Sequence, residues 1–197
     1  MKIGIIGSGN VGQALAMRWS TNGHEVVFGS RRPSDAEEGV VRTVGIRQAA
    51  EISEVIVICV PWNAVRLVLQ ETGPLAGKPV IDCTNPLNPG LSGLELGLTT
   101  SAAEQIADWV PQAAVFKAFN TTGAENIAST VGYSPKPVMF VCGDHADRKP
   151  TVLSLASELG FEAVDAGDLS AARLLEPMAM LWIYLSYKQK LGRDFAF

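Results

Sequence analysis

Short apolar runs alternate along the chain with longer stretches in which apolar residues recur at helical spacing. Continuous runs rich in Val and Ile are typical of strands that are buried on both faces of a sheet. Such strands are expected at residues 2–6, 25–28, 55–60, 79–83, 114–119, 138–142 and 161–165. The helical spacing predicts helices near residues 11–21, 46–52, 63–72, 101–109, 152–159 and 170–190, and a short one after residue 123.

This alternation of strands and helices predicts the fold class. Strand–helix–strand units give parallel strands whose connecting helices cover both faces of the sheet. We therefore expect an α/β fold, a Rossmann-type doubly wound and mostly parallel sheet with a short C-terminal helical extension, in which Pro177 is expected to kink the last helix. Residues 30–45 and 86–100 have no pattern that fixes their conformation, and loops as long as the second are often functional or mobile.

Composition and charge narrow the class of protein. The 197 residues suit one domain, and 47% hydrophobic against 18% charged residues exclude a disordered chain. The net charge of −4 and the lack of a long basic run argue against nucleic acid as a partner. The longest apolar run, residues 178–185, is too short to span a bilayer, and the N-terminus has no signal-peptide pattern. We expect a cytoplasmic protein with no membrane partner.

The cysteines and histidines limit the chemistry further. Cys59, Cys83 and Cys142 are odd in number, widely spaced and set in apolar stretches, which fits neither a disulfide framework nor a zinc site. This usage suits a reducing compartment. Because His24 and His145 are the only histidines, no metal site is expected. No Ser-His-Asp, Cys-His or paired-carboxylate arrangement indicates hydrolysis.

The strongest functional signal follows the first strand. A G-x-G-x-x-G run leads there from a strand into a helix, which is the context of dinucleotide-binding turns. Its first glycine permits the tight turn, the second lets a pyrophosphate approach the backbone, and the third allows close helix–strand packing. The free N–H groups of the helix N-terminus favour phosphate. The alternative is a Gly-rich turn without a ligand. The complete run is Gly7, Ser8, Gly9, Asn10, Val11 and Gly12.

The end of the second strand indicates which dinucleotide is bound. NAD sites place an acidic residue there to bind the ribose hydroxyls. This chain has Gly29, Ser30, Arg31 and Arg32 instead. Ser30 can hydrogen-bond a 2′-phosphate, and either arginine can pair with it through two hydrogen bonds. The sequence therefore favours NADP(H) over NAD(H), with the alternative that one or both arginines only line a solvated loop.

The nicotinamide end is expected at the carboxyl ends of the central strands, where ligands bind in doubly wound sheets. Val60, Pro61 and Trp62 would form an apolar wall beside the ribose and nicotinamide. Asn85 and Asn120 are candidate partners for the nicotinamide amide or for the substrate. The alternatives are packing at a helix N-terminus for Trp62 and ordinary turn chemistry for Asn85.

Few residues near this edge could serve as an acid or base. Lys117 lies on a predicted strand there, and it could act as a general acid or extend its ammonium to the strand end. Reduction of a carbonyl usually needs a proton donor, whereas hydride transfer between two redox cofactors needs mainly proximity and orientation. The residues present fit cofactor-to-cofactor transfer better than dehydrogenation of a hydroxy acid.

Several short motifs follow one another along the chain: residues 7–12, 29–32, 60–62, 117–121, 141–144 and 165–167, and then Arg173, Leu174 and Glu176. In this order they resemble the motifs of the F420-dependent NADP reductase family over nearly the whole chain. Residues 117–120 are also similar to the oxidoreductase domain of the STEAP metalloreductases. The segment 32–45 is shorter than in the family, and the loop 85–100 has no recognisable deazaflavin contacts.

The resemblance implies an NADP-binding Rossmann domain at residues 1–167, with residues 168–197 as a helical extension packed on the same domain. It implies hydride transfer between C4 of the nicotinamide and C5 of a deazaflavin, coenzyme F420, or a flavin-like acceptor. It also implies that residues 8–11 bind the pyrophosphate, that Ser30 and Arg31 bind the 2′-phosphate, and that residues 61–62 and Asn120 lie near the nicotinamide. A homodimer is expected, with helix 170–190 either at its interface or in the core.

Two other functions remain open. The chain could be an NADP(H)-sensing binding protein without turnover, because the lack of an acid–base residue suits that role equally. It could also be a small-molecule dehydrogenase, although such enzymes usually add a larger helical domain than the C-terminal residues can supply. The acceptor, the favoured direction and the dimer geometry do not follow from the sequence.

Overall fold

A computed structural model describes residues 1–33 and 41–197 of the chain. Its centre is an eight-stranded sheet in the order β3-β2-β1-β4-β5-β6-β7-β8. All neighbouring strands are parallel except β6 and β7, so the expected doubly wound, mostly parallel sheet is confirmed. The strands are β1 (Lys2–Ile6), β2 (Glu25–Ser30), β3 (Arg42–Gly45), β4 (Val55–Ile58), β5 (Pro79–Asp82), β6 (Ala114–Lys117), β7 (Val138–Gly143) and β8 (Glu162–Asp165).

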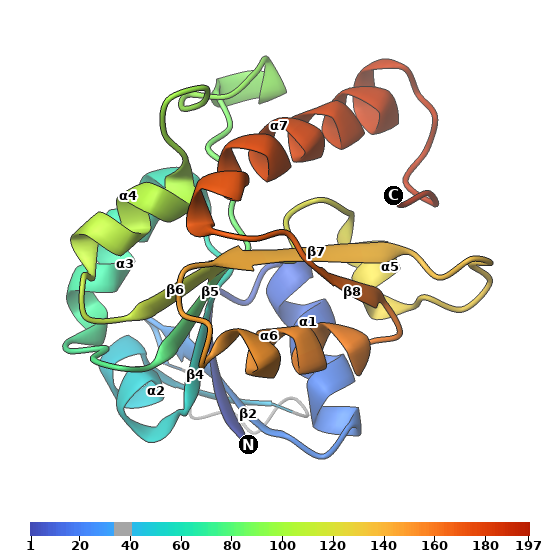
Figure 1. Cartoon of the computed structure of the whole chain (residues 1–197). Coiled ribbons are helices and arrows are strands. Elements are labelled where there is room, and N and C mark those ends of the chain that lie inside the picture. The colour runs from blue at the N-terminus through green and yellow to red at the C-terminus, as the bar shows by residue number, and fades with distance from the viewer. Residues whose placement is uncertain (34–40) are drawn as a thin grey trace.

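Helices cover both faces of this sheet (Figure 1). Ile3 and Ile5 of β1 pack in one core with α1, α5 and α6, whereas Ile6 packs in a second core with α2, α3, α4 and α7. This division follows from the alternation of side chains along a strand. The helices are α1 (Asn10–Thr21), α2 (Ile46–Ile52), α3 (Trp62–Thr72), α4 (Ala102–Trp109), α5 (Ala124–Ala128), α6 (Lys149–Ser157) and α7 (Ala172–Ile183).

The strands differ from the sequence expectation mainly at their ends. β2 runs two residues further, to Ser30, whereas β4 and β6 stop two residues early, at Ile58 and Lys117. The strand β3 was not expected, because its residues Arg-Thr-Val-Gly show no apolar run; it forms the edge of the sheet beside β2. Of the unassigned stretch 30–45, residues 34–40 lie outside the described part of the chain.

Two other regions, whose conformation the sequence does not fix in detail, have a defined secondary structure. In the loop 86–100, a 3₁₀ turn spans Pro89–Leu91 and an isolated bridge joins Leu87 to Leu94. The last predicted helix, 170–190, is a 3₁₀ turn (Leu169–Ala171), then α7, and then a π-helical turn (Tyr184–Lys188), and Pro177 lies inside α7.

The chain end returns to the sheet. The backbone N–H of Val138 at the start of β7 donates to the carbonyl oxygen of Phe197 at 2.7 Å. The Asn126 side chain on α5 donates to the backbone oxygens of Arg193 and Phe195. These bonds fix the C-terminal segment against α5 and β7. Within residues 1–33 and 41–197, no helix combines the length and the apolar character needed to cross a membrane.

Candidate functional site

Two neighbouring cavities open at the carboxyl ends of the central strands, where the sequence predicts a ligand. The larger has a volume of about 590 Å³ and extends from the start of α1 to the end of α7. The smaller has a volume of about 180 Å³ and lies between the first Gly-rich turn and the end of β2. Both are lined by Val60 and Pro61, so these two residues form the wall that the cavities share.

The three glycines of the first turn have three different surroundings. Gly7 has φ of +112°, and a Cβ there would lie 2.5 Å from the carbonyl oxygen of Cys59. A Cβ on Gly12 would collide with the carbonyl oxygen of Gly7. Gly9, the N-cap of α1, has no atom within 4 Å of the place where a Cβ would stand. The fold requires Gly7 and Gly12, whereas the space at Gly9 is open and lies before the free N–H groups of α1.

The smaller cavity brings together residues from the two expected phosphate-binding segments. Gly7 and Ser8 line it from the first turn, and Ser30 and Arg31 line it from the end of β2. Arg32 is not among its lining residues; its backbone N–H donates to the Ser30 Oγ at 3.1 Å. Of the two arginines, Arg31 is therefore the one that the structure brings to this cavity.

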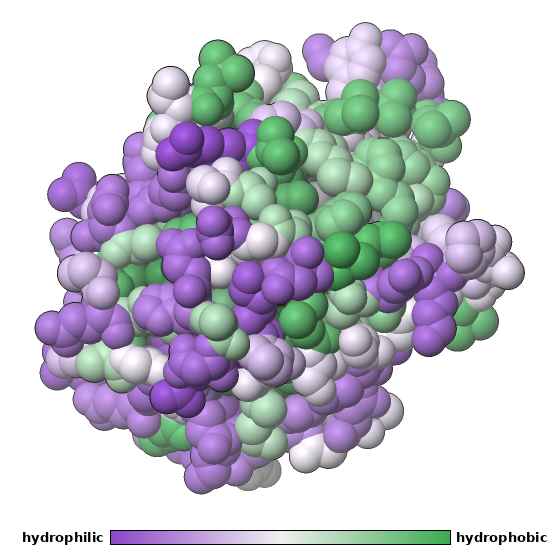
Figure 2. Space-filling view, in the orientation of Figure 1, coloured by the Kyte–Doolittle hydropathy of each residue, from purple (hydrophilic) through white to green (hydrophobic). Residues whose placement is uncertain are grey.

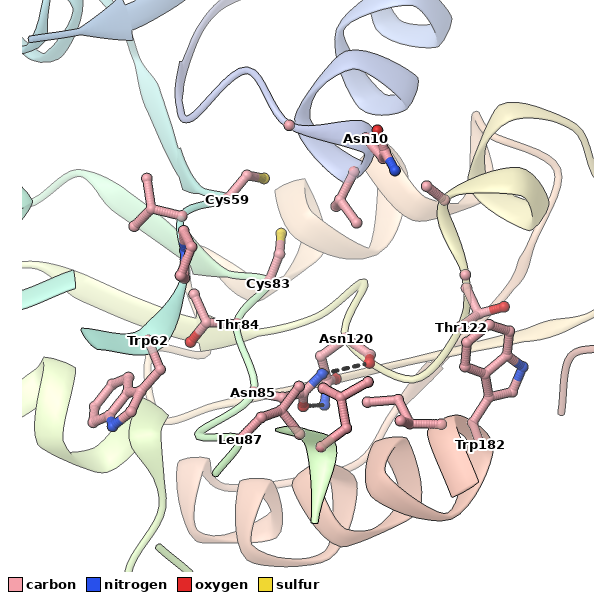
Figure 3. Close-up of a pocket in the computed structure, with 18 of the residues that line it drawn as sticks. Asn10, Cys59, Trp62, Cys83, Thr84, Asn85, Leu87, Asn120, Thr122 and Trp182 are labelled. Carbon is pink, nitrogen blue, oxygen red and sulfur yellow. Dashed lines mark hydrogen bonds between the residues drawn. The ribbon is translucent and has the colours of Figure 1, made fainter. Parts of the chain in front are cut away.

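The larger cavity contains the other predicted residues (Figure 3). Asn10 and Val11 line it from α1, and Trp62 lines it from the start of α3. The Trp62 ring also stacks on the Trp109 ring of α4, with centroids 5.4 Å apart. The Trp62 side chain therefore both lines the cavity and packs against α4.

Asn85 and Asn120 hold each other at the base of this cavity (Figure 3). The Asn85 side chain donates to the backbone oxygen of Asn120, and the Asn120 Nδ2 donates to the Asn85 Oδ1, both at 3.0 Å. A second bond from the Asn120 Nδ2 to the Leu175 oxygen fixes the orientation of that amide. The Asn120 Oδ1 and the Thr84 Oγ1 are then buried without a hydrogen-bond partner among the described residues. Buried polar atoms without partners are costly, so the two oxygens suit a ligand with a polar edge.

Phe119 explains how Asn120 reaches the cavity. Its φ of +59° is rare for a residue with a side chain, and it turns the backbone sharply after β6. Such backbone strain is of the order of 1–3 kcal/mol and is typical of functional sites. The fully buried Phe119 ring packs edge-on against Trp19, which holds the strained turn in place.

The sequence suggests that Lys117 either acts as a general acid or extends its ammonium to the strand end, and the structure buries it. Its side chain is fully buried, and its Nζ lies 2.5 Å from Asp82 Oδ2 and 2.8 Å from Glu176 Oε1. It also donates to the Thr84 oxygen at 2.7 Å. Burial alone would lower the pKa of Lys117, but the two carboxylates outweigh burial and raise it above its usual value. The residue is not among those that line either cavity, so it supports Thr84 from behind.

The C-terminal segment completes the larger cavity, which the sequence patterns did not reveal. Trp182 and Ile183 from the end of α7, and Tyr187 and Arg193 beyond it, line the side opposite α1. The Arg193 guanidinium lies over the Tyr187 ring, 5.5 Å from its centroid, and pairs with Glu125 at 2.9 Å. The sequence feature that could have indicated these residues is the occurrence of aromatic and basic side chains close to the C-terminal end. Cys59, Cys83 and Thr84 were also missed, although Cys59 and Cys83 directly follow β4 and β5 at the predicted edge and Thr84 is the next residue after Cys83.

The cavities together fit a dinucleotide. Open space at Gly9 before a helix N-terminus suits a pyrophosphate. A serine and an arginine line one side, and an apolar wall with unpartnered polar oxygens lines the other. Gly7, Ser8, Gly9, Asn10, Val11, Ser30, Arg31, Val60, Pro61, Trp62, Asn85 and Asn120 all line one or both cavities, whereas Gly12 and Arg32 line neither.

Comparison with known proteins adds a family. A family model described as "NADP oxidoreductase coenzyme F420-dependent" matches residues 2–86. The chain is 32% identical to the F420-dependent NADP reductase of Methanothermobacter marburgensis over 223 residues, covering 97% of this chain and 95% of that protein.

The similarity extends to a second group and to a solved structure. The metalloreductase STEAP3 of Rattus norvegicus is 31% identical over 189 residues, but the chain spans only 36% of its length. A crystal structure from Arthrobacter sp. FB24, which carries the provisional name of F420-dependent NADP reductase, superposes with a TM-score of 0.89 at 29% identity. That match covers 100% of this chain and 98% of the other.

Proposed function

The chain belongs to the F420-dependent NADP oxidoreductase family, related to the STEAP oxidoreductase domain, and from this we propose that it transfers a hydride between NADP(H) and a deazaflavin such as coenzyme F420 or a flavin-like acceptor. The family binds NADP(H) and acts as an oxidoreductase. When bound, the nicotinamide supplies or receives the hydride at C4. The residues of this chain bind, orient and shield the reacting rings.

One observation carries the proposal: the larger cavity has polar groups for orientation but almost none for proton transfer. The described residues that line this cavity include no His, Asp, Glu or Lys. Transfer of a hydride between two cofactors needs proximity and orientation rather than a proton donor. Asn120 and Thr84 provide polar atoms for a ring edge, and Pro61 and Trp62 provide an apolar surface.

The roles proposed for the chain follow the two cavities. Residues 8–11 bind the pyrophosphate through the N-terminus of α1, and Ser30 and Arg31 bind the 2′-phosphate. The larger cavity holds the nicotinamide and, in contact with it, the acceptor ring. Its volume of about 590 Å³ lies within the range of about 300–1,000 Å³ that is usual for ligand pockets.

Residues 168–197 belong to the same functional unit as residues 1–167 in this proposal. The main segment contributes the turn, the strand ends and the asparagine pair, and the extension contributes Trp182, Ile183, Tyr187 and Arg193. The extension thereby shields the reacting groups from water on the side that α1 leaves open.

An acceptor screen tests this proposal. The protein and NADPH are mixed anaerobically with coenzyme F420, FMN or a ferric chelate, and oxidation of NADPH is followed by its absorbance. We expect rapid reduction of F420, weaker reduction of FMN and no direct reduction of the chelate. Tight NADPH binding without oxidation by any acceptor would contradict the proposal and favour a sensing role. Oxidation by carbonyl compounds alone would favour a small-molecule dehydrogenase.

A further inference from the structure

Two cysteines stand side by side at the carboxyl edge of the sheet. Cys59 directly follows β4 and Cys83 directly follows β5. These strands are parallel neighbours, with Ile58 opposite Asp82 in their register. The N–H of Cys83 donates to the carbonyl oxygen of Ile58 at 3.1 Å, which continues the ladder by one step. Cys59 therefore stands opposite Cys83.

Both side chains point to the same side of the sheet. Residues opposite each other in a parallel pair project to one face, and both cysteines pack in the core that contains α1, α5 and α6. Both also line the larger cavity (Figure 3). The pKa of the Cys83 thiol is raised, mainly by burial and secondly by a hydrogen bond with the Cys59 side chain. Such a bond forms only between close neighbours.

The spacing is compatible with a covalent bond between the two sulfurs. Neighbouring strands lie about 4.7–4.9 Å apart, and the Cα atoms of a disulfide lie about 4.4–6.8 Å apart. Both residues are at strand ends, where a small backbone adjustment breaks few ladder bonds. No large movement is needed to join them.

We propose that Cys59 and Cys83 form a dithiol modification site in the coenzyme cavity, which hydroperoxides convert into an intramolecular disulfide. Cys59 is the more exposed of the two and reacts first. Its thiolate attacks the terminal peroxide oxygen and the O–O bond breaks. A sulfenic acid forms, and the other oxygen leaves as an alkoxide, or as hydroxide when the oxidant is hydrogen peroxide. The Cys83 sulfur then displaces the hydroxyl group, which leaves as water, and the disulfide forms. Two thiols lose two electrons and two protons in total, and a dithiol reductant returns them.

The state of the cavity governs access to this site. The oxidant must reach Cys59 through the space that its neighbours Val60 and Pro61 share with the proposed coenzyme site. If the proposed function holds, bound NADP⁺ or NADPH covers Cys59, and only the free protein is oxidised. The inference therefore rests on the proposed function for its coenzyme dependence, but not for the disulfide itself.

Cys142 provides an internal control. It is fully buried on β7, its Sγ donates to the Leu169 oxygen at 3.8 Å, and it does not line the larger cavity. Burial raises its pKa to about 12, so almost no thiolate is present near neutral pH. The thiolate is the form that attacks a peroxide, and Cys142 also lies away from the cavity through which the oxidant enters. Cys142 is therefore expected to stay reduced, whereas Cys83 attacks only the sulfenic acid of its neighbour Cys59.

The experiment treats the coenzyme-free protein with hydrogen peroxide, alkylates the remaining thiols and identifies the peptides by mass spectrometry. We expect one cross-linked species, Cys59 to Cys83, which lacks two hydrogen atoms, together with alkylated Cys142. Cys83→Ser is expected to accumulate a sulfenic acid at Cys59, detected with dimedone, and Cys142→Ser to behave as the wild type. Oxidation of Cys59 beyond the sulfenic acid in the wild type without the cross-link, or equal oxidation of Cys142, would overturn the proposal.

A parallel arm separates this inference from the proposed function. Calorimetry first measures how much protein binds NADP⁺, and the oxidation is repeated at that occupancy. We expect the rate of cross-linking to fall in proportion to the fraction of free protein. Binding without protection would overturn the coenzyme dependence. Cross-linking in a protein that does not bind NADP⁺ would support the disulfide and refute the proposed function.

Discussion

Local backbone brings Gly7, Gly9 and Arg31 to the two cavities, because each of them stands directly at a strand end or a helix start. For the same reason the sequence predicts these three positions, whereas it does not predict the role of Lys117. Its partners Asp82 and Glu176 are distant in the sequence and come together only when the sheet and α7 pack.

Gly9 allows a test in which coenzyme binding changes while the fold does not. Its φ of −73° suits any residue, and a Cβ there meets no atom within 4 Å. Gly9→Ala is therefore expected to keep the melting temperature of the wild type and to weaken NADPH binding, because the methyl group occupies the space proposed for the pyrophosphate. Calorimetry and thermal melts measure both.

The matched control for that variant is Gly45→Ala. Gly45 is also a helix N-cap with extended backbone and open space at its Cβ, but it lines neither cavity. The Gly45→Ala variant should keep the melting temperature and the NADPH affinity of the wild type. Unchanged NADPH affinity in Gly9→Ala would refute the pyrophosphate role of this turn.

The 2′-phosphate assignment makes a prediction about coenzyme preference. Arg31→Ala is expected to weaken NADPH binding by about 1.5–3 kcal/mol, the value of a hydrogen bond to a charged group. NADH binding should hardly change, because NADH lacks that phosphate. Arg32→Ala is the control, since Arg32 does not line the cavity. Equal losses for NADPH and NADH in Arg31→Ala would disprove the assignment.

At the scale of elements, the helix and strand cores were predictable, whereas the strand ends and the edge strand were not. Residues 46–52 form the expected helix, because a local apolar pattern determines α2. β6 ends two residues early because Phe119 adopts a positive φ, which no pattern of apolar residues reports. β3 depends on pairing with β2 and has no apolar run of its own.

The buried ion triad joins β5, β6, α4 and α7. Lys117 pairs with Asp82 and Glu176, and the Glu176 carboxylate also accepts the N–H groups of Ala102 and Ala103 at the start of α4. Lys117→Met leaves two carboxylates buried without their cation, and such a loss costs about 3–5 kcal/mol. Urea denaturation should show this decrease in the free energy of unfolding.

Lys78→Met provides the comparison, and pH provides a second readout. The Lys78 Nζ donates to three backbone oxygens and has no carboxylate partner among residues 1–33 and 41–197, so its loss should cost less. The pKa of Lys117 is raised in the folded state above its usual value of 10.5, so its contribution is complete below pH 10.5 and is lost as the pH rises through the raised value. The difference between wild type and Lys117→Met should shrink there. A pH-independent difference would contradict a charged triad.

At the scale of the whole molecule, one face of α7 has no partner within the described chain. Leu174 is 73% exposed and Leu181 is 50% exposed, while Leu175 and Trp182 of the same helix are buried. Figure 2 shows hydrophobic residues gathered over α7 at the upper right. The helix thus serves the core and leaves an apolar surface, which suits the expected homodimer.

The dimer is tested by changing that face alone. Leu174→Glu combined with Leu181→Glu is expected to give a monomer by light scattering, because charges in an apolar interface are costly. Leu67→Glu on α3 is the control, since Leu67 is 48% exposed on another helix. A double variant that keeps the mass of the wild type, or a wild type that is itself a monomer, would refute the dimer interface on this face.

In the proposed reaction, the larger cavity brings a nicotinamide and an acceptor ring into direct contact. A decisive measurement uses NADPH with deuterium at both positions of nicotinamide C4 and coenzyme F420 in ordinary water under anaerobic conditions. We expect mass spectrometry to find one deuterium on C5 of the reduced deazaflavin. Reduced deazaflavin without deuterium, or no reduction although NADPH is bound, would contradict the proposed reaction.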